Sequence, residues 1–93
     1  MRLVESCLAR IETADRDLRA WVSVDASGAR ADAERADDNL SRGVVLGVLH
    51  GIPIGIKDIV DVAGTVTAAG SPLRIKSESP AERDAELVTA LRR

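Results

Sequence analysis

The hydrophobic positions of the first forty residues recur at helical spacing and predict two helices. Over residues 3–21 the apolar side chains fall on one stripe, three or four positions apart, while most charged side chains fall elsewhere. A second stripe, made almost entirely of alanine, predicts a helix over residues 26–42. Asp25 can serve as the N-cap of this second helix, and Gly43 fits the position after its end.

From residue 44 onward the pattern changes to glycine and β-branched residues. Residues 53–60 read Pro-Ile-Gly-Ile-Lys-Asp-Ile-Val, which is typical of a buried strand entered through a proline. Residues 79–82 resemble a capping box and predict a third helix over residues 80–93, with Asp84 as an alternative cap. That helix meets no stop signal. Even with a second short strand over residues 65–67, one or two strands and three helices are too little to cover both faces of a sheet. We therefore expect the N-terminal portion of a single, longer α/β domain.

The composition of the chain limits which kinds of partner it can bind and which cellular compartment it suits. The chain has 93 residues, one Trp, no Phe or Tyr, and a formal net charge of −2 with acids and bases interspersed. This charge pattern does not suggest nucleic-acid binding. No apolar stretch reaches the roughly 20 residues that a membrane span needs. The single Cys7 suits a reducing compartment, so we expect a cytoplasmic chain with neither a nucleic-acid nor a membrane partner.

Lys57 is the residue that the pattern does not explain, because it interrupts the apolar run 52–62. An amine held among apolar groups has its charged form disfavoured, and a neutral amine can accept a proton from a hydroxyl. The structural alternative is a lysine whose tip reaches solvent or pairs with Asp58 or Asp61. The residues by themselves leave both interpretations open.

Other candidate chemistry is weaker. Gly51 and Gly55 have the wrong spacing for a phosphate-binding loop, and Asp58 follows the lysine where such a loop has Ser or Thr. One histidine and one distant cysteine cannot assemble a zinc site, so we expect neither metal nor cofactor. For His50 a structural or solvent-facing role is favoured. Asp58 and Asp61, on opposite faces of a strand, are interpreted as a strand-end cap and a turn residue.

Longer motifs carry a resemblance to a known family. Residues 50–58 read HGIPIGIKD, residues 61–64 read DVAG and residues 67–71 read TAAGS. Together with residues 18–25 and 80–85 they resemble the amidase signature family across nearly the whole chain. The resemblance implies an α/β/α fold with helices around a mixed sheet, incomplete in this chain. It also implies amide hydrolysis by two serines, one of them at a cis peptide bond, with Lys57 as the catalytic base.

The resemblance stops short of the nucleophile. The family's Gly- and Ser-rich segment has no counterpart in this chain, and Ser71 occupies a position that is not the nucleophile. We therefore expect an N-terminal fragment of an amidase, inactive alone, whose complete form takes a small-molecule amide. The glutamine-hydrolysing subunit of a tRNA-dependent amidotransferase is the alternative enzyme. A further alternative is a non-catalytic remnant or interaction module. Self-association or a complementary C-terminal fragment would cover the strand edges that such a chain leaves exposed.

Overall fold

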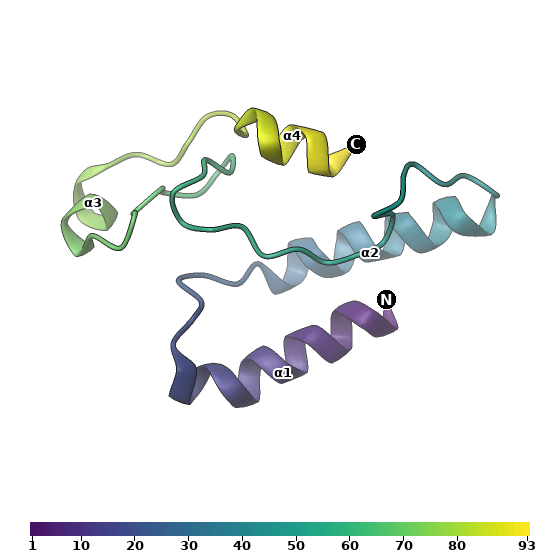
Figure 1. The fold of residues 1–93 in the computed structure, drawn as a ribbon, viewed down its shortest axis with the longest axis horizontal. Helices are drawn as coiled ribbons and strands as arrows, with labels where there is room; N and C mark the ends of the chain where they lie inside the picture. Colours follow the sequence, from purple (N-terminus) through teal and green to yellow (C-terminus); the bar gives the residue numbers. More distant parts are fainter. The chain divides into compact units, whose positions relative to one another are not determined.

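The computed structural model describes residues 1–93 and contains four helices and no strand (Figure 1). The helices are α1 (Arg2–Leu18), α2 (Ala26–Ser41), α3 (Pro72–Ser77) and α4 (Glu86–Arg92). They fall into two compact units, Met1–Ile54 with the two longer helices and Gly55–Arg93 with the two shorter ones. None of the four helices is both long and apolar enough to cross a membrane.

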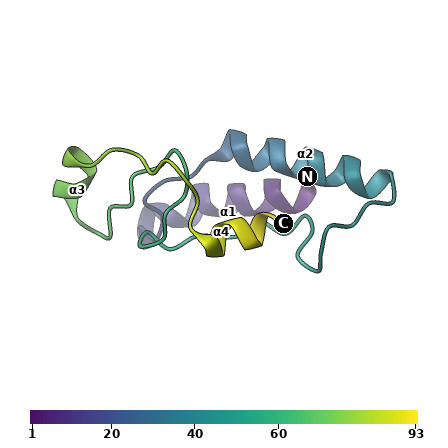
Figure 2. The ribbon, with the colours of Figure 1, turned by 90° about the horizontal axis from the view of Figure 1, so that it is seen from above.

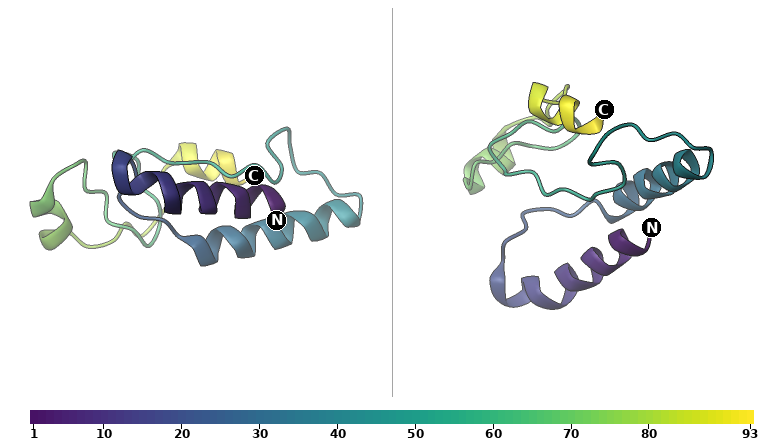
Figure 3. Two further views of the ribbon diagram at one scale, coloured as in Figure 1. Left: turned by 90° about the horizontal axis from the view of Figure 1, so that it is seen from below. Right: turned by 45° about the vertical axis from the view of Figure 1, so that its right-hand side comes forward.

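The first unit is built on α1 and α2, which lie side by side and run in opposite directions (Figures 2 and 3). Its buried side chains are Val4 and Ala33, each 5% exposed. Alanine in α2 lets the two helices approach closely, but it buries little apolar area. Ion pairs at the edge of the contact supplement this small core: Glu5 pairs with Arg30, and the amino group of Met1 lies 2.9 Å from Asp37 Oδ2.

The first helix ends three residues earlier than its hydrophobic stripe predicts. Arg19 adopts a left-handed conformation with φ of 49°, and its N–H donates to the Asp15 carbonyl at 2.8 Å. The Asp15 carboxylate then accepts hydrogen bonds from the N–H groups of Ala20 (2.6 Å) and Trp21 (3.2 Å). A side chain that binds the exit of a helix competes with continued helical bonding. Trp21 therefore lies beyond the helix rather than on it.

The second helix is capped by Asp25, whose Oδ1 accepts a hydrogen bond from the Gly28 N–H at 2.9 Å. It ends at Ser41, one residue before the predicted end. Gly43, with φ of 76°, follows in the left-handed conformation that terminates many helices.

In the second unit, α4 begins at Glu86 and not at residue 80. The backbone of Ala81 is already bonded elsewhere, because its carbonyl accepts from Gly64 N–H and its N–H donates to the Thr65 carbonyl, both at 2.9 Å. The expected capping box is therefore not formed. The helix α3 was not expected from the sequence; it opens with Pro72 at its first turn, where the missing N–H of proline costs no hydrogen bond.

The predicted strand over residues 53–60 is not formed in this structure. Residues 52–57 are neither helix nor strand, and residues 58–60 make a turn in which the Val60 N–H donates to the Lys57 carbonyl at 3.0 Å. A strand exists only when a neighbouring strand completes its hydrogen bonds, and no second strand is present here. The predicted burial fails with it: Ile54 is 44% and Ile59 is 62% exposed.

Candidate functional site

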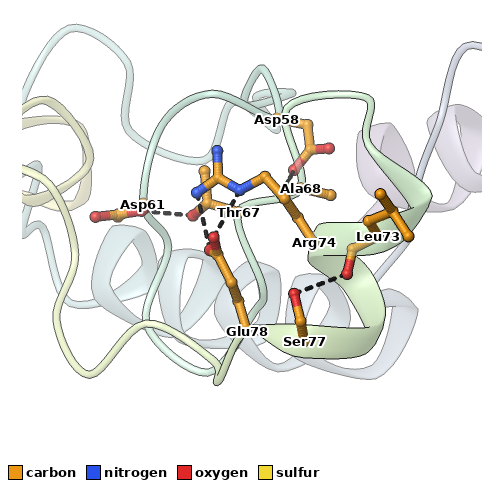
Figure 4. Close-up of polar contacts among 8 residues, drawn as sticks. All are labelled: Asp58, Asp61, Thr67, Ala68, Leu73, Arg74, Ser77 and Glu78. Carbon is orange, nitrogen blue, oxygen red and sulfur yellow. Dashed lines mark hydrogen bonds and ion pairs between the residues drawn. The ribbon is translucent and has the colours of Figure 1, made fainter.

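Lys57 lies immediately before the turn at residues 58–60, between the half-buried residues Ile56 and Asp58. Its side chain is exposed, so the expected apolar surrounding is not provided by these 93 residues. What the second unit does provide is a fixed backbone directly after the lysine. The contacts that fix it come from residues 67–69 and reach Asp58 and Asp61 (Figure 4).

Asp58 makes the main attachment. Its carboxylate oxygen Oδ1 accepts a hydrogen bond from the Ala68 N–H at 3.0 Å, and its backbone carbonyl accepts one from the Ala69 N–H at 2.8 Å. Ala68 is 1% exposed, and the hydrogen bond from its N–H to Asp58 is partly buried. The second carboxylate oxygen, Oδ2, is buried and has no hydrogen-bond partner. Asp58 thus joins the lysine-bearing segment to the stretch around residue 68.

The turn that receives Asp58 depends on two consecutive left-handed residues. Ala69 has φ of 49° and Gly70 has φ of 76°, and the Ser71 N–H closes the turn on the Ala68 carbonyl at 2.9 Å. This geometry is open to glycine and is uncommon for other residues. From the sequence, residues 70–72 are recognisable only as a break in the pattern.

Asp61 makes a second attachment between the same two stretches. Its carboxylate accepts a short hydrogen bond from the Thr67 hydroxyl (Figure 4), and its carbonyl accepts one from the Ala85 N–H at 2.9 Å. The interpretation of Asp58 as a strand-end cap is therefore wrong, because no strand is formed, and Asp61 lies before the turn at residues 63–64 rather than in it. Without the strand, both carboxylates bind the 67–68 stretch. Thr67 was missed, because a lone threonine carries no signal of its partner.

Arg74, on α3, adds positive charge to this region. Its Nε and Nη2 atoms each lie 2.8 Å from an oxygen of Glu78, one helical turn later. This two-bond pair raises the pKa of Arg74 and lowers the pKa of Glu78; the negative charges of Asp58 and Asp61 raise the pKa of Arg74 further. Sequence reasoning missed this pair, because α3 was not predicted.

His50, in the first unit, is held through both ring nitrogens. Nδ1 accepts a hydrogen bond from the Leu46 N–H at 3.3 Å, so Nε2 carries the proton and donates to the Ala36 carbonyl at 2.8 Å. The ring borders an open hollow of about 520 Å³ whose wall includes Leu40 and Ile52. With both nitrogens engaged by the backbone, His50 has the structural role that the sequence favours.

The remaining chemistry of the chain is sparse. No group of three or more His, Cys, Asp or Glu side chains is placed to hold a metal ion. Cys7 is a free, half-buried thiol on α1. The site therefore consists of one amine on a backbone that is fixed by Asp58. Such an arrangement can hold or accept a proton, but it contains no activated nucleophile.

The sequence of this chain is similar to the sequences of known proteins over most of its length. The profile of the Amidase family matches residues 2–93. The chain is 47% identical over 91 residues to "Putative amidase AmiB2" of Mycobacterium tuberculosis, covering 97% of this chain and 19% of that protein. It is 44% identical over 71 residues to a subunit of the Glutamyl-tRNA(Gln) amidotransferase of Chloroflexus aggregans, covering 76% of this chain and 14% of that protein.

A solved structure is also similar. It is described as an unexpected vestigial protein complex that reveals the evolutionary origins of an s-triazine catabolic enzyme. The match has a TM-score of 0.91 with 35% identity, and it covers 98% of this chain and 20% of the solved chain. The chain thus spans about a fifth or less of the proteins that it matches.

Proposed function

We propose that this chain, which belongs to the Amidase family, supplies Lys57 as the proton-accepting base for hydrolysis of a carboxylic amide. The observation that carries the proposal is the position of Lys57 within the motif HGIPIGIKD, on a backbone that Asp58 attaches to residues 68 and 69. A base must present its lone pair in a fixed direction, and this attachment fixes the backbone from which the amine extends.

The reaction that the family resemblance implies needs two serines besides the lysine. The amine of Lys57 takes a proton, through the second serine, from the hydroxyl of the first, whose oxygen attacks the amide carbonyl. The C–N bond then breaks, the leaving amine takes up the proton, and water hydrolyses the resulting acyl-serine. Backbone N–H groups hold the developing oxyanion. The serines are not among the residues of this chain that match the motif, and the remainder of an amidase polypeptide would supply them.

The same remainder would complete the fold. Residues 53–60 have the composition of a strand, and we propose that they become one when a neighbouring strand of the mixed sheet is available. Ile52, Ile54 and Ile59, now about half exposed, would then be covered. Once these isoleucines are covered, the Lys57 amine would be surrounded by apolar groups. In such a setting an amine most readily gives up its charge.

A second enzyme is supported by relatives of another kind. Several amidotransferase chains are 40% to 44% identical to this chain, but over 71 to 73 residues, whereas the mycobacterial amidases match over 90 to 91. This wider match favours a free-standing amidase. Glutaminase activity that depends on further subunits and on charged tRNA would instead favour the amidotransferase.

Substitution of Lys57 in the complete enzyme tests the proposal. Lys57→Ala removes the base, and Lys57→Arg replaces it with a group that does not release its proton, so each should lower the rate of acylation by about 10²–10⁴-fold. Lys76, exposed on α3, is the only other lysine of this chain, and Lys76→Ala is the matched control. Acylation is measured as the burst of product in a rapid-mixing experiment. Near-normal bursts in either Lys57 variant would overturn the role of the lysine.

The partner of the chain is part of the same proposal. We propose a complementary amidase segment rather than self-association, and a cytoplasmic location consistent with the free thiol of Cys7. Mixing the 93-residue chain with a separately produced C-terminal segment should restore amide hydrolysis. Sedimentation then distinguishes a heterodimer from a homodimer, and circular dichroism reports whether strand content appears on mixing. A stable, monomeric chain that binds no such segment would favour the non-catalytic remnant.

A further inference from the structure

We infer that Asp58 is a positioning residue for Lys57, and this inference rests on the proposed role of Lys57 as the base. Asp58 does not need to touch the substrate to fill this role. It acts through the backbone that it shares with the lysine, by attaching that backbone to residues 68 and 69.

Asp58 makes this attachment through two hydrogen bonds, which together fix the orientation of the segment that carries Lys57. The Asp58 side chain is bonded to the Ala68 N–H at 3.0 Å, and its carbonyl is bonded to the Ala69 N–H at 2.8 Å. One hydrogen bond would allow the segment to rotate about it, whereas two bonds from one residue to neighbouring N–H groups fix both position and orientation. The peptide that joins Lys57 to Asp58 is thereby held, and with it the origin of the lysine side chain.

The turn at residues 68–71, to which Asp58 is bonded, is closed by a hydrogen bond of its own. Asp58 is therefore not attached to an unsupported loop. Ala68 is 1% exposed, and its carbonyl is bonded to the Ser71 N–H at 2.9 Å. Asp61 and Thr67 add a second link between the same stretches. The hydrogen bond from the Ala68 N–H to Asp58 is partly buried, which reduces the competition of water for this donor.

The two carboxylate oxygens of Asp58 differ in a way that sharpens the test. Oδ1 has the Ala68 N–H as its partner, whereas Oδ2 is buried and has none. Asparagine keeps an oxygen that can accept from Ala68 and removes the charge, while alanine removes the acceptor. Glutamate keeps the charge but moves the acceptor by one carbon. If Asp58 acts as an acceptor that positions the backbone, asparagine should replace it and glutamate should not.

The experiment measures kcat and KM of the complete amidase with a simple amide substrate. Displacing a catalytic group by about 1 Å costs about 10²-fold in rate, so Asp58→Ala should lower kcat by about 10²-fold with KM within about threefold of wild type. Asp58→Glu should also lower kcat, and Asp58→Asn should stay within about tenfold of wild type. Rates are divided by the folded fraction from circular dichroism, so a loss of folded enzyme alone leaves kcat unchanged.

Asp84→Ala is the matched control for stability. Asp84 also holds a backbone N–H of the second unit, that of Ala63 at 2.8 Å, but it is remote in sequence from the lysine. Its replacement should lower the unfolding temperature and leave kcat unchanged. An equal loss of kcat in Asp84→Ala and Asp58→Ala would show a general effect of instability and would overturn the positioning role.

The remaining outcomes separate this inference from the proposed function. A wild-type kcat in Asp58→Ala, with Lys57→Ala inactive, overturns the role of Asp58 and leaves Lys57 as the base. Equal inactivity of Asp58→Asn and Asp58→Ala also overturns it, because the retained acceptor would then not suffice. Full activity of Lys57→Ala overturns the proposed function itself.

Discussion

Arg30 on α2 meets Glu5 on α1 through two donors of one guanidinium: Nε lies 2.6 Å from Oε1, and Nη2 lies 3.3 Å from Oε2. The pair connects two helices whose only buried side chains are Val4 and Ala33. Its hydrogen bonding is the main reason that the pKa of Glu5 is lowered and the pKa of Arg30 is raised.

Stability of the helix pair should therefore depend on pH through Glu5. A carboxylate whose pKa is lower in the folded state contributes stability above its unfolded value, near 4.5, and loses it as the pH falls through the lowered pKa. The urea midpoint of the chain should fall as the pH drops below about 4.5, and Glu5→Gln should show a shallower fall. Both side chains are about half exposed, at 47% and 48%, so added salt should reduce the difference. Equal pH slopes for Glu5→Gln and wild type would count against the pair.

The cap of α2 predicts a non-additive pair of substitutions. Asp25→Ala removes the acceptor of the Gly28 N–H and should cost about 1 kcal/mol. A Cβ at residue 28 would lie 2.0 Å from Asp25 Oδ2, so Gly28→Ala alone displaces the cap and loses most of its gain in helix propensity.

In the double variant, which combines Asp25→Ala with Gly28→Ala, no aspartate side chain clashes with the new Cβ. The propensity gain of about 0.8–1.0 kcal/mol should then offset most of the lost cap. Urea unfolding of the four proteins measures this coupling. Strictly additive effects would mean that the Cβ and the cap do not compete.

Asp84 should contribute to the stability of the second unit through both carboxylate oxygens. Oδ1 accepts from the Ala63 N–H at 2.8 Å and Oδ2 lies 3.0 Å from Arg92 Nε, with the side chain only 18% exposed. Asp84→Ala should lower the free energy of unfolding by about 1–2 kcal/mol. Asp84→Asn keeps the acceptor for Ala63 and should lose less. Equal losses in the two variants would assign the effect to charge alone.

His50 should be found in a single tautomer. The Leu46 N–H requires an acceptor at Nδ1 and the Ala36 carbonyl requires a donor at Nε2, so the proton lies on Nε2 in the neutral ring. Nitrogen-15 spectra of the neutral ring should show a protonated Nε2 and a bare Nδ1. His50→Asn, with a shorter side chain, cannot serve both partners and should destabilise the first unit. A mixture of tautomers would mean that one of the two contacts is not made in solution.

Local signals in the sequence were sufficient wherever the structure depends on near neighbours. The stripe of alanines, the cap at Asp25 and the glycine at residue 43 mark α2 to within one residue, because capping and periodicity act over only a few positions. The motif around Lys57 identifies the family in the same way, since it is a continuous run of residues.

Tertiary structure decided the features that join residues distant in the chain. Asp58 and Asp61 were interpreted as a strand-end cap and a turn residue, yet both bind the stretch around residues 67–68. The backbone of Ala81 is engaged by residues 64 and 65, which delays α4 to Glu86. A strand-like composition at residues 53–60 did not produce a strand, because a strand needs a hydrogen-bonding neighbour.

The sequence alone therefore determined the family of this chain and singled out Lys57, because both depend on residue identity in one short run. The tertiary structure decided how the backbone of that run is held, by Asp58 on the N–H groups of Ala68 and Ala69. Which donor meets which acceptor depends on how segments ten or more residues apart pack together, and periodicity does not carry that information.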